Sequence, residues 1–147
     1  MEFLRVKRVR ASAVLPRRAT DGSAGYDLYA CVDSPVTVRP HECAAIPTGI
    51  AISLPDNSAA AFVFARSGLS VKHGLAPANC VGVIDSDYRG EIIVNLVNRL
   101  ESEYTIEPGE RVAQLVIMPV LTPELTEADT LDETARGGGG FGSTGRL

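Results

Sequence analysis

The sequence predicts an all-β domain of the sandwich, jelly-roll or barrel type. Apolar and polar residues alternate over short stretches, and Gly, Pro, Asn or Asp closes most of these stretches. Many short strands at close spacing, separated by such turns, are typical of these architectures. The 147 residues suffice for one domain with its own hydrophobic core.

The strands follow one another along most of the chain. They are expected at residues 4–7, 36–39, 50–54, 60–65, 92–97, 104–106 and 111–117, and the segment 24–30 follows the first of them. One helical turn is expected from Gly68 to about Lys72, because Ser67 is suited to cap its N-terminus. No other segment has an amphipathic helical period.

Residues 79–90 combine turn formers with acidic and aromatic side chains. The segment reads Asn-Cys-Val-Gly-Val-Ile-Asp-Ser-Asp-Tyr-Arg-Gly and precedes a β-branched run, which favours a β-hairpin tip or a strand end. Asp85, Asp87 and Tyr88 lie between its two glycines. Turn formation alone explains Asp and Gly about as well as a functional role does. Only the rest of the chain can decide between these two interpretations of the segment.

Composition and charge exclude several classes of protein. The net charge of −4 argues against a surface that coats nucleic acid, and no apolar run is long enough to cross a membrane. The charged N-terminus does not resemble a signal peptide. Cys31, Cys43 and Cys80 lack metal or disulfide spacing. We therefore expect a soluble, cytoplasmic protein.

Two regions are expected: a β core over residues 1–120 and an arm over residues 121–147. Residues 122–134 are polar and acidic, and residues 135–146 read Ala-Arg-Gly-Gly-Gly-Gly-Phe-Gly-Ser-Thr-Gly-Arg. Such a segment cannot pack by itself and is expected to be flexible. Its arginine, phenylalanine and hydroxyls suit an arm that orders over an anionic, flat ligand.

Three segments can bind anions. Arg66-Ser-Gly-Leu offers a guanidinium, a hydroxyl and backbone N–H groups, although a capped turn with a surface arginine explains it equally. The Gly-rich arm offers Arg136 and two hydroxyls, and it is not a P-loop. Gln114 can hold a phosphate or a water, or simply be an exposed strand amide.

Acidic residues complete the inventory for a nucleoside triphosphate. Asp27, Asp85 and Asp87 suit Mg²⁺, which prefers carboxylates, water and phosphate oxygens, and one carboxylate can also deprotonate an attacking water. Tyr88 and Phe141 can pack on a sugar and a base. No nucleophilic side chain is evident, so attack by water is the simpler mechanism.

Five segments together resemble the five motifs of the trimeric deoxyuridine triphosphatases, in order and spacing. They are residues 24–28 (Ala-Gly-Tyr-Asp-Leu), 66–69, 79–90, 109–115 (Gly-Glu-Arg-Val-Ala-Gln-Leu) and 136–145. Each motif alone is weak, but five in order are specific. The resemblance implies a distorted jelly-roll or β-barrel subunit with one short helix, a flexible C-terminal arm, and a homotrimer whose active sites are shared between subunits.

The resemblance also implies an activity and residue roles. The activity is hydrolysis of dUTP to dUMP and pyrophosphate by water attack on the α-phosphate, which keeps uracil out of DNA and supplies dUMP for thymidylate synthesis. Asp85 would orient the water, Tyr88 would exclude a ribose 2′-hydroxyl, and Asp27 would help to hold Mg²⁺ through water. Gln114 would join the phosphate and water network. The substrate-binding residues would be Asn79, Gly82, Val83 and Ile84 for uracil, Phe141 stacked on it beside Gly142, and Arg66, Ser67, Gly68, Arg136, Ser143 and Thr144 for the phosphates.

The sequence departs from the family's motifs at two positions, and two other functions compete with dUTP hydrolysis. Ala65 stands where the family often has proline, and Glu110 where aspartate is commoner, but neither change removes a nucleotide contact. A related deoxycytidine triphosphate deaminase would need a catalytic glutamate beside residues 79–90, and none is expected there. A nucleotide-sensing module without catalysis would be expected to lack Asp85 or the arm motif, and both are present.

Overall fold

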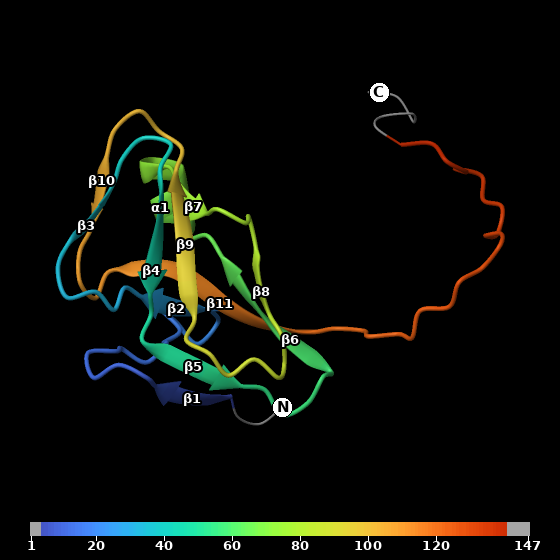
Figure 1. Cartoon of the computed structure of the whole chain (residues 1–147), viewed down its shortest axis with the longest axis horizontal. Coiled ribbons are helices and arrows are strands. Elements are labelled where there is room, and N and C mark those ends of the chain that lie inside the picture. The colour runs from blue at the N-terminus through green and yellow to red at the C-terminus, as the bar shows by residue number, and fades with distance from the viewer. Residues whose placement is uncertain (1–3, 141–147) are drawn as a thin grey trace.

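The computed structural model describes residues 4–140, and within them eleven strands and one short helix (Figure 1). The helix is α1 (Ser67–His73). The strands are β1 (Arg5–Arg8), β2 (Tyr26–Tyr29), β3 (Val36–Val38), β4 (Cys43–Pro47), β5 (Ile50–Ser53), β6 (Ala59–Phe64), β7 (Leu75–Pro77), β8 (Gly82–Ile84), β9 (Ile93–Asn98), β10 (Tyr104–Ile106) and β11 (Arg111–Pro119). The all-β prediction with one short helix is confirmed.

The strands form small antiparallel sheets that enclose one core. One sheet has the order β2-β11-β6-β8, a second has β4-β9-β7, and two pairs, β1-β5 and β10-β3, complete the layers. Consecutive strands β7 and β8 belong to different sheets, so the chain crosses from one sheet to the other at residues 78–81. This crossing separates β8 from β9 and creates the site described below.

The core is aliphatic and nearly closed to solvent. Its fully buried side chains come from both larger sheets and from the β10-β3 pair, and they include Leu28, Ile46, Leu96, Ile106 and Leu115. Asn98 is buried among them and is fully hydrogen-bonded: its side-chain amide donates to the carbonyls of Val38 (3.0 Å) and Ser102 (2.7 Å) and its side-chain oxygen accepts from Leu100 N (3.0 Å). Pairing of this kind lets a polar group sit in the core without a desolvation penalty.

Three features of the local structure differ from the sequence expectations. The strands β4, β7 and β8 were not predicted, because Cys43–Pro47 and Leu75–Pro77 contain alanine and proline, and because Gly82–Ile84 resembles a turn. Ser67 is not the N-cap: Arg66 occupies that position in an extended conformation, without a side-chain cap, and Ser67 begins the helix. Of the two alternatives for residues 79–90, the structure shows a strand end, after β8, and no hairpin, since β8 pairs with β6 and not with β9.

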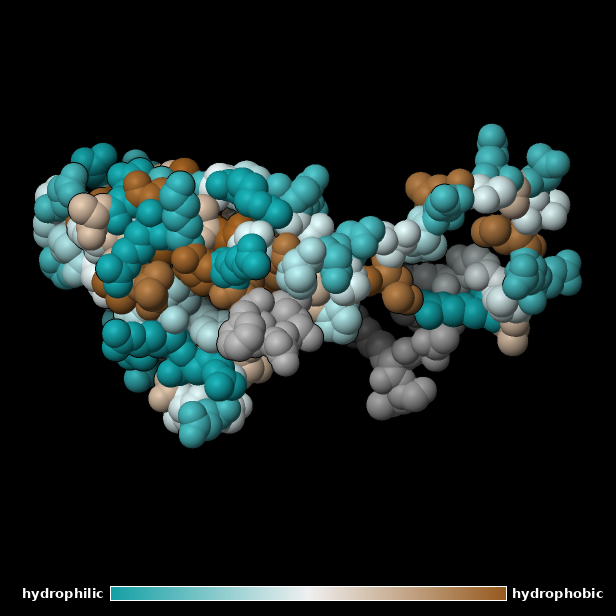
Figure 2. Space-filling model, turned by 90° about the horizontal axis from the view of Figure 1, so that it is seen from below, coloured by the Kyte–Doolittle hydropathy of each residue, from teal (hydrophilic) through white to brown (hydrophobic). Residues whose placement is uncertain are grey.

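Beyond Val120 the described chain leaves the core as an extended segment without strands or helices (Figure 1). Leu121, Leu125 and Leu131 are 95%, 97% and 87% exposed, and the arm shows separate apolar patches between hydrophilic residues (Figure 2). Because these three leucines are not buried against the rest of their own chain, the segment that carries them does not pack on the core. In the part of the chain that the structure describes, no helix is long and apolar enough to cross a membrane.

Candidate active site

A cavity of about 290 Å³ lies between β8 and β9, where the chain crosses between sheets. Among the described residues β8 is an edge strand, paired only with β6, so its outer backbone groups face the cavity side unpaired by any ladder. An edge of this kind can hydrogen-bond a flat polar ligand as it would another strand. The cavity brings together six predicted site residues, namely Asn79, Gly82, Val83, Ile84, Asp85 and Tyr88.

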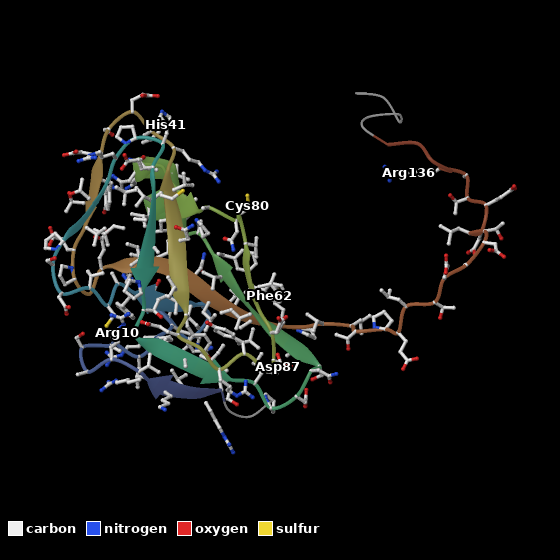
Figure 3. All side chains as sticks on the ribbon, viewed as in Figure 1. Arg10, His41, Phe62, Cys80, Asp87 and Arg136 are labelled. Carbon is white, nitrogen blue, oxygen red and sulfur yellow. The ribbon has the colours of Figure 1, made fainter. Side chains whose placement is uncertain are left out.

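A tight turn after β8 presents Asp85 and Tyr88 to this cavity. The backbone N–H of Tyr88 donates to the carbonyl of Asp85 (3.2 Å), and the Tyr88 hydroxyl donates to the carbonyl of Glu91 (3.0 Å). The Tyr88 ring lies so close to Gly90 that a Cβ at this position would overlap it. Gly90 therefore leaves the space that the Tyr88 ring occupies. Asp87 (Figure 3) is exposed as Asp85 and Tyr88 are, but unlike them it is outside the cavity lining.

Glu91 is the one charged residue of this cavity lining that the sequence interpretation missed. No catalytic glutamate was expected beside residues 79–90, yet the carboxylate-bearing Glu91 is part of the cavity lining. Its carboxylate accepts from Arg10 Nε (2.7 Å), Arg10 Nη2 (3.0 Å) and Gly49 N (2.8 Å). The hydrogen bond from Arg10 holds the pKa of Glu91 below its ordinary value, against partial burial, which raises it. Glu91 therefore stays ionised near neutral pH, unlike a catalytic proton donor.

A second cluster joins β2, β11 and the start of α1. Asp27 accepts from Arg66 Nε (3.0 Å) on one oxygen and from Arg111 Nη1 (3.1 Å) on the other, and Arg66 Nη1 donates to the carbonyl of Arg111 (3.0 Å). The Gln114 amide donates to the carbonyl of Ala65 (2.8 Å). The Arg66 side chain is thus oriented by two partners, Asp27 and the Arg111 carbonyl, and Gln114 fixes the backbone just before it.

The two clusters lie toward opposite ends of one sheet. In the β6–β8 ladder Gly82 pairs with Val63 and Ile84 with Ala61, so β8 carries Asp85 away from Arg66. Arg66 is five residues beyond Ala61 in an extended stretch, which corresponds to roughly 16 Å at about 3.3 Å per residue. In a single chain, Asp85 and Arg66 therefore do not flank the same point.

The arm residues lie apart from both clusters. Arg136 donates from Nε to the carbonyl of Gly139 (2.9 Å), and it lies far from the core (Figure 3). The predicted residues Phe141, Gly142, Ser143 and Thr144 are outside residues 4–140, which the structure describes.

The acidic side chains of the site show how a metal ion could be bound. No group of three or more His, Cys, Asp or Glu side chains in residues 4–140 is arranged to hold a metal ion. Both oxygens of Asp27 already accept from arginines. Asp27 consequently fits contact with metal-bound water better than direct ligation, and the remaining ligands would have to come from substrate phosphates and water.

Comparison with known sequences identifies the family. A family model described as dUTPase matches residues 11–145. The chain belongs to the dUTPase family. Two dUTPase relatives, both named deoxyuridine 5′-triphosphate nucleotidohydrolase, resemble it over most of their lengths. The one from Desulfitobacterium hafniense (strain DSM 10664 / DCB-2) is 56% identical over 131 residues, covering 89% of this chain and 87% of the relative. The one from Burkholderia mallei (strain SAVP1) is 49% identical over 143 residues, covering 97% of each.

Solved dUTPase structures share the fold. A mutant dUTPase of Staphylococcus bacteriophage 80alpha with dUpNHpp superimposes with a TM-score of 0.90 at 32% identity, covering 99% of this chain and 100% of the other. A mutant dUTPase from phage phi11 of S. aureus, described with a structural Mg(II) ion, has a TM-score of 0.80 at 28% identity, covering 90% and 100%. The jelly-roll prediction is confirmed.

The two residues that depart from the usual dUTPase motifs, Ala65 and Glu110, make defined hydrogen bonds. Ala65 offers its carbonyl to Gln114, and a backbone carbonyl does this whichever side chain the position carries. Glu110 accepts from the Tyr104 hydroxyl (2.6 Å) and from Glu107 N (3.0 Å), so it closes the turn before β11. Both contacts stabilise the backbone and leave the cavity unchanged.

Proposed function

We propose that this protein hydrolyses dUTP to dUMP and pyrophosphate and thereby limits uracil in DNA and supplies dUMP for thymidylate synthesis. The observation that carries the proposal is the cavity beside the open edge of β8, with Asp85 and Tyr88 on its rim, in a dUTPase fold. Uracil would pair with the backbone of Gly82–Ile84 and with the side chain of Asn79. Tyr88 would lie against the deoxyribose and leave no room for a 2′-hydroxyl.

The chemistry assigned to Asp85 is proton transfer. Its carboxylate would accept a proton from a water whose oxygen attacks the α-phosphorus, while the bond from that phosphorus to the bridging oxygen breaks and pyrophosphate leaves with the electron pair. Arg66, Ser67 and Gly68 would bind the phosphates, and Gln114 would hold the phosphate and water network. Arg136, Ser143 and Thr144 would bind the terminal phosphates, with Phe141 and Gly142 over the base. Mg²⁺, when bound, neutralises charge on the phosphate oxygens, and Asp27 would contact its waters.

Assembly as a homotrimer with shared sites is part of this proposal. It is supported by the separation of Asp85 from Arg66 within one chain, roughly 16 Å along the sheet by the strand rise. One triphosphate would then be bound by the β8 cavity of one subunit, the Arg66 cluster of a second, and an arm. Sedimentation as a monomer at micromolar concentration would refute shared sites. A cytoplasmic location is included, since Cys31, Cys43 and Cys80 are all free thiols.

A phosphate-release assay coupled to pyrophosphatase, run on dUTP, dCTP, dTTP and UTP, tests the function. Wild-type protein should prefer dUTP, and Asp85→Asn should bind it but turn over about 10²-fold or more slowly, the scale of lost general-base catalysis. Asp87→Asn is the matched control, because Asp87 is an exposed acid two residues away and outside the cavity lining. Equal turnover by the two variants would contradict the role of Asp85 as the general base. A preference of the wild-type protein for another nucleotide would contradict dUTP as the substrate.

A further inference from the structure

Glu91 is fixed at both of its polar ends. Its side chain is 18% exposed, and its carboxylate accepts two hydrogen bonds from Arg10 and one from Gly49 N. Its backbone carbonyl accepts the Tyr88 hydroxyl at 3.0 Å. A bidentate arginine–carboxylate pair defines orientation as well as distance, so Glu91 has little freedom to rotate.

Arg10 is itself fixed by the same segment of chain. Its backbone N–H donates to the Gly49 carbonyl (3.3 Å), as does that of Val9 (2.8 Å), and Arg10 lies beside the start of β5 (Figure 3). Gly49 has φ +70°, and a Cβ there would lie 2.6 Å from the Ala13 Cβ and 2.7 Å from the Cys31 sulfur. Only glycine fits this point, which therefore binds Arg10 through its carbonyl and Glu91 through its N–H.

The contacts form a continuous connection from the N-terminal segment to the rim of the cavity. It runs from Arg10 to the Glu91 carboxylate and from the Glu91 carbonyl to the Tyr88 hydroxyl. Tyr88 is 46% exposed, so packing alone does not hold its ring on the solvent side. Apart from its place against Gly90, the ring is located by this hydroxyl contact.

We propose that Arg10 and Glu91 are positioning residues for sugar selection, acting through Tyr88. The inference rests on the proposed function, in which Tyr88 excludes the ribose 2′-hydroxyl. Steric exclusion of one hydroxyl requires a ring that cannot retreat, because a displacement near 1 Å is enough to alter rates strongly. Arg10 is not part of the cavity lining, so it would contribute to specificity without contacting substrate.

The test measures kcat/KM for dUTP and for UTP. Arg10→Met keeps much of the side-chain length but loses both hydrogen bonds to Glu91, and the dUTP-to-UTP ratio should fall roughly tenfold, mainly through better use of UTP. Tyr88→Phe, which loses the hydroxyl contact to Glu91, should cause a similar fall. The double variant should fall no further than either single one, because both changes release the same ring. Arg39→Met is the control, since Arg39 is 73% exposed with only a 3.9 Å contact to Glu42.

Each outcome has a distinct meaning. A wild-type protein that ignores dUTP, or that uses UTP equally well, contradicts the proposed function. A selective wild-type protein whose Arg10→Met variant folds and keeps the ratio contradicts the positioning role, and so does a double variant in which the two effects add. If thermal melting shows that Arg10→Met is unfolded, Arg10→Lys decides: lysine cannot pair bidentately, so an intermediate fall in the ratio is expected. An unchanged ratio in that folded variant overturns the inference.

Discussion

Replacing Asn98 by alanine tests how much of the stability of the core depends on one polar side chain. Asn98 has no exposed surface, and its removal leaves two carbonyls, of Val38 and Ser102, and the N–H of Leu100 without their partners. A buried group left without its partner costs about 1–3 kcal/mol. Because water can enter the space of the lost amide and recover part of this cost, we expect Asn98→Ala to lose about 3–4 kcal/mol of unfolding free energy.

The assay is thermal unfolding followed by circular dichroism at one fixed protein concentration, because assembly makes the melting temperature depend on concentration. A loss of this size corresponds to a melting temperature lower by roughly 10 °C for a chain of this length. Asn57→Ala is the matched control, since Asn57 is exposed in the loop before β6, and it should melt as wild type does. A shift of less than about 2 °C for Asn98→Ala would show that the three hydrogen bonds contribute almost nothing net, and would refute the reasoning.

Three further results are expected. A chain ending at Thr134 should fold and assemble, because the strands end at Pro119, yet it should lose most of its kcat/KM. When it is mixed with full-length Asp85→Asn chains, activity should return. Co-assembled trimers without activity would argue against arms that act across subunits. The stability that the Arg10–Glu91 pair contributes should be present above pH 4.5 and lost as the pH falls through the lowered pKa of Glu91, so acid unfolding of Glu91→Gln should depend less on pH over that range. Burial and the hydrogen bond to Glu110 raise the pKa of Tyr104 to about 12. One of the four tyrosines should therefore ionise late in an absorbance titration, and the free energy of unfolding should fall between pH 10 and 12. Tyr104→Phe should abolish the late ionisation step.

The strands that could be predicted are those whose own residues carry the pattern. Residues 50–53 and 59–64 are rich in apolar residues bounded by turn formers, and both formed strands at nearly the predicted bounds. Leu75–Pro77 and Gly82–Ile84 are three residues long and gain their structure from β9 and β6, partners distant in sequence. Local propensity carries no information about such pairing.

The site could be predicted only as far as its motifs. Asp85 and Tyr88 were found because they lie in a recognisable segment, and the structure brings both to one cavity. Arg10 and Glu91 are separated by 81 residues, and an arginine near the N-terminus has no local signal of its partner. Arg111 was likewise missed as the second partner of Asp27, because a strand arginine is usually a solvated side chain.

The crossing at residues 78–81 has a mechanical consequence. The walls of the cavity, Gly82–Ile84 and Ile93–Asn95, belong to different sheets, and the ladder hydrogen bonds of each wall stay within its own sheet, to β6 and to β4 respectively. The gap between these walls can therefore widen or narrow as one sheet shifts relative to the other, without breaking a single rung of either ladder. The two connections that flank the gap, residues 78–81 and 85–92, have to bend with it. A base can enter a slot built in this way while every strand stays paired in its own ladder.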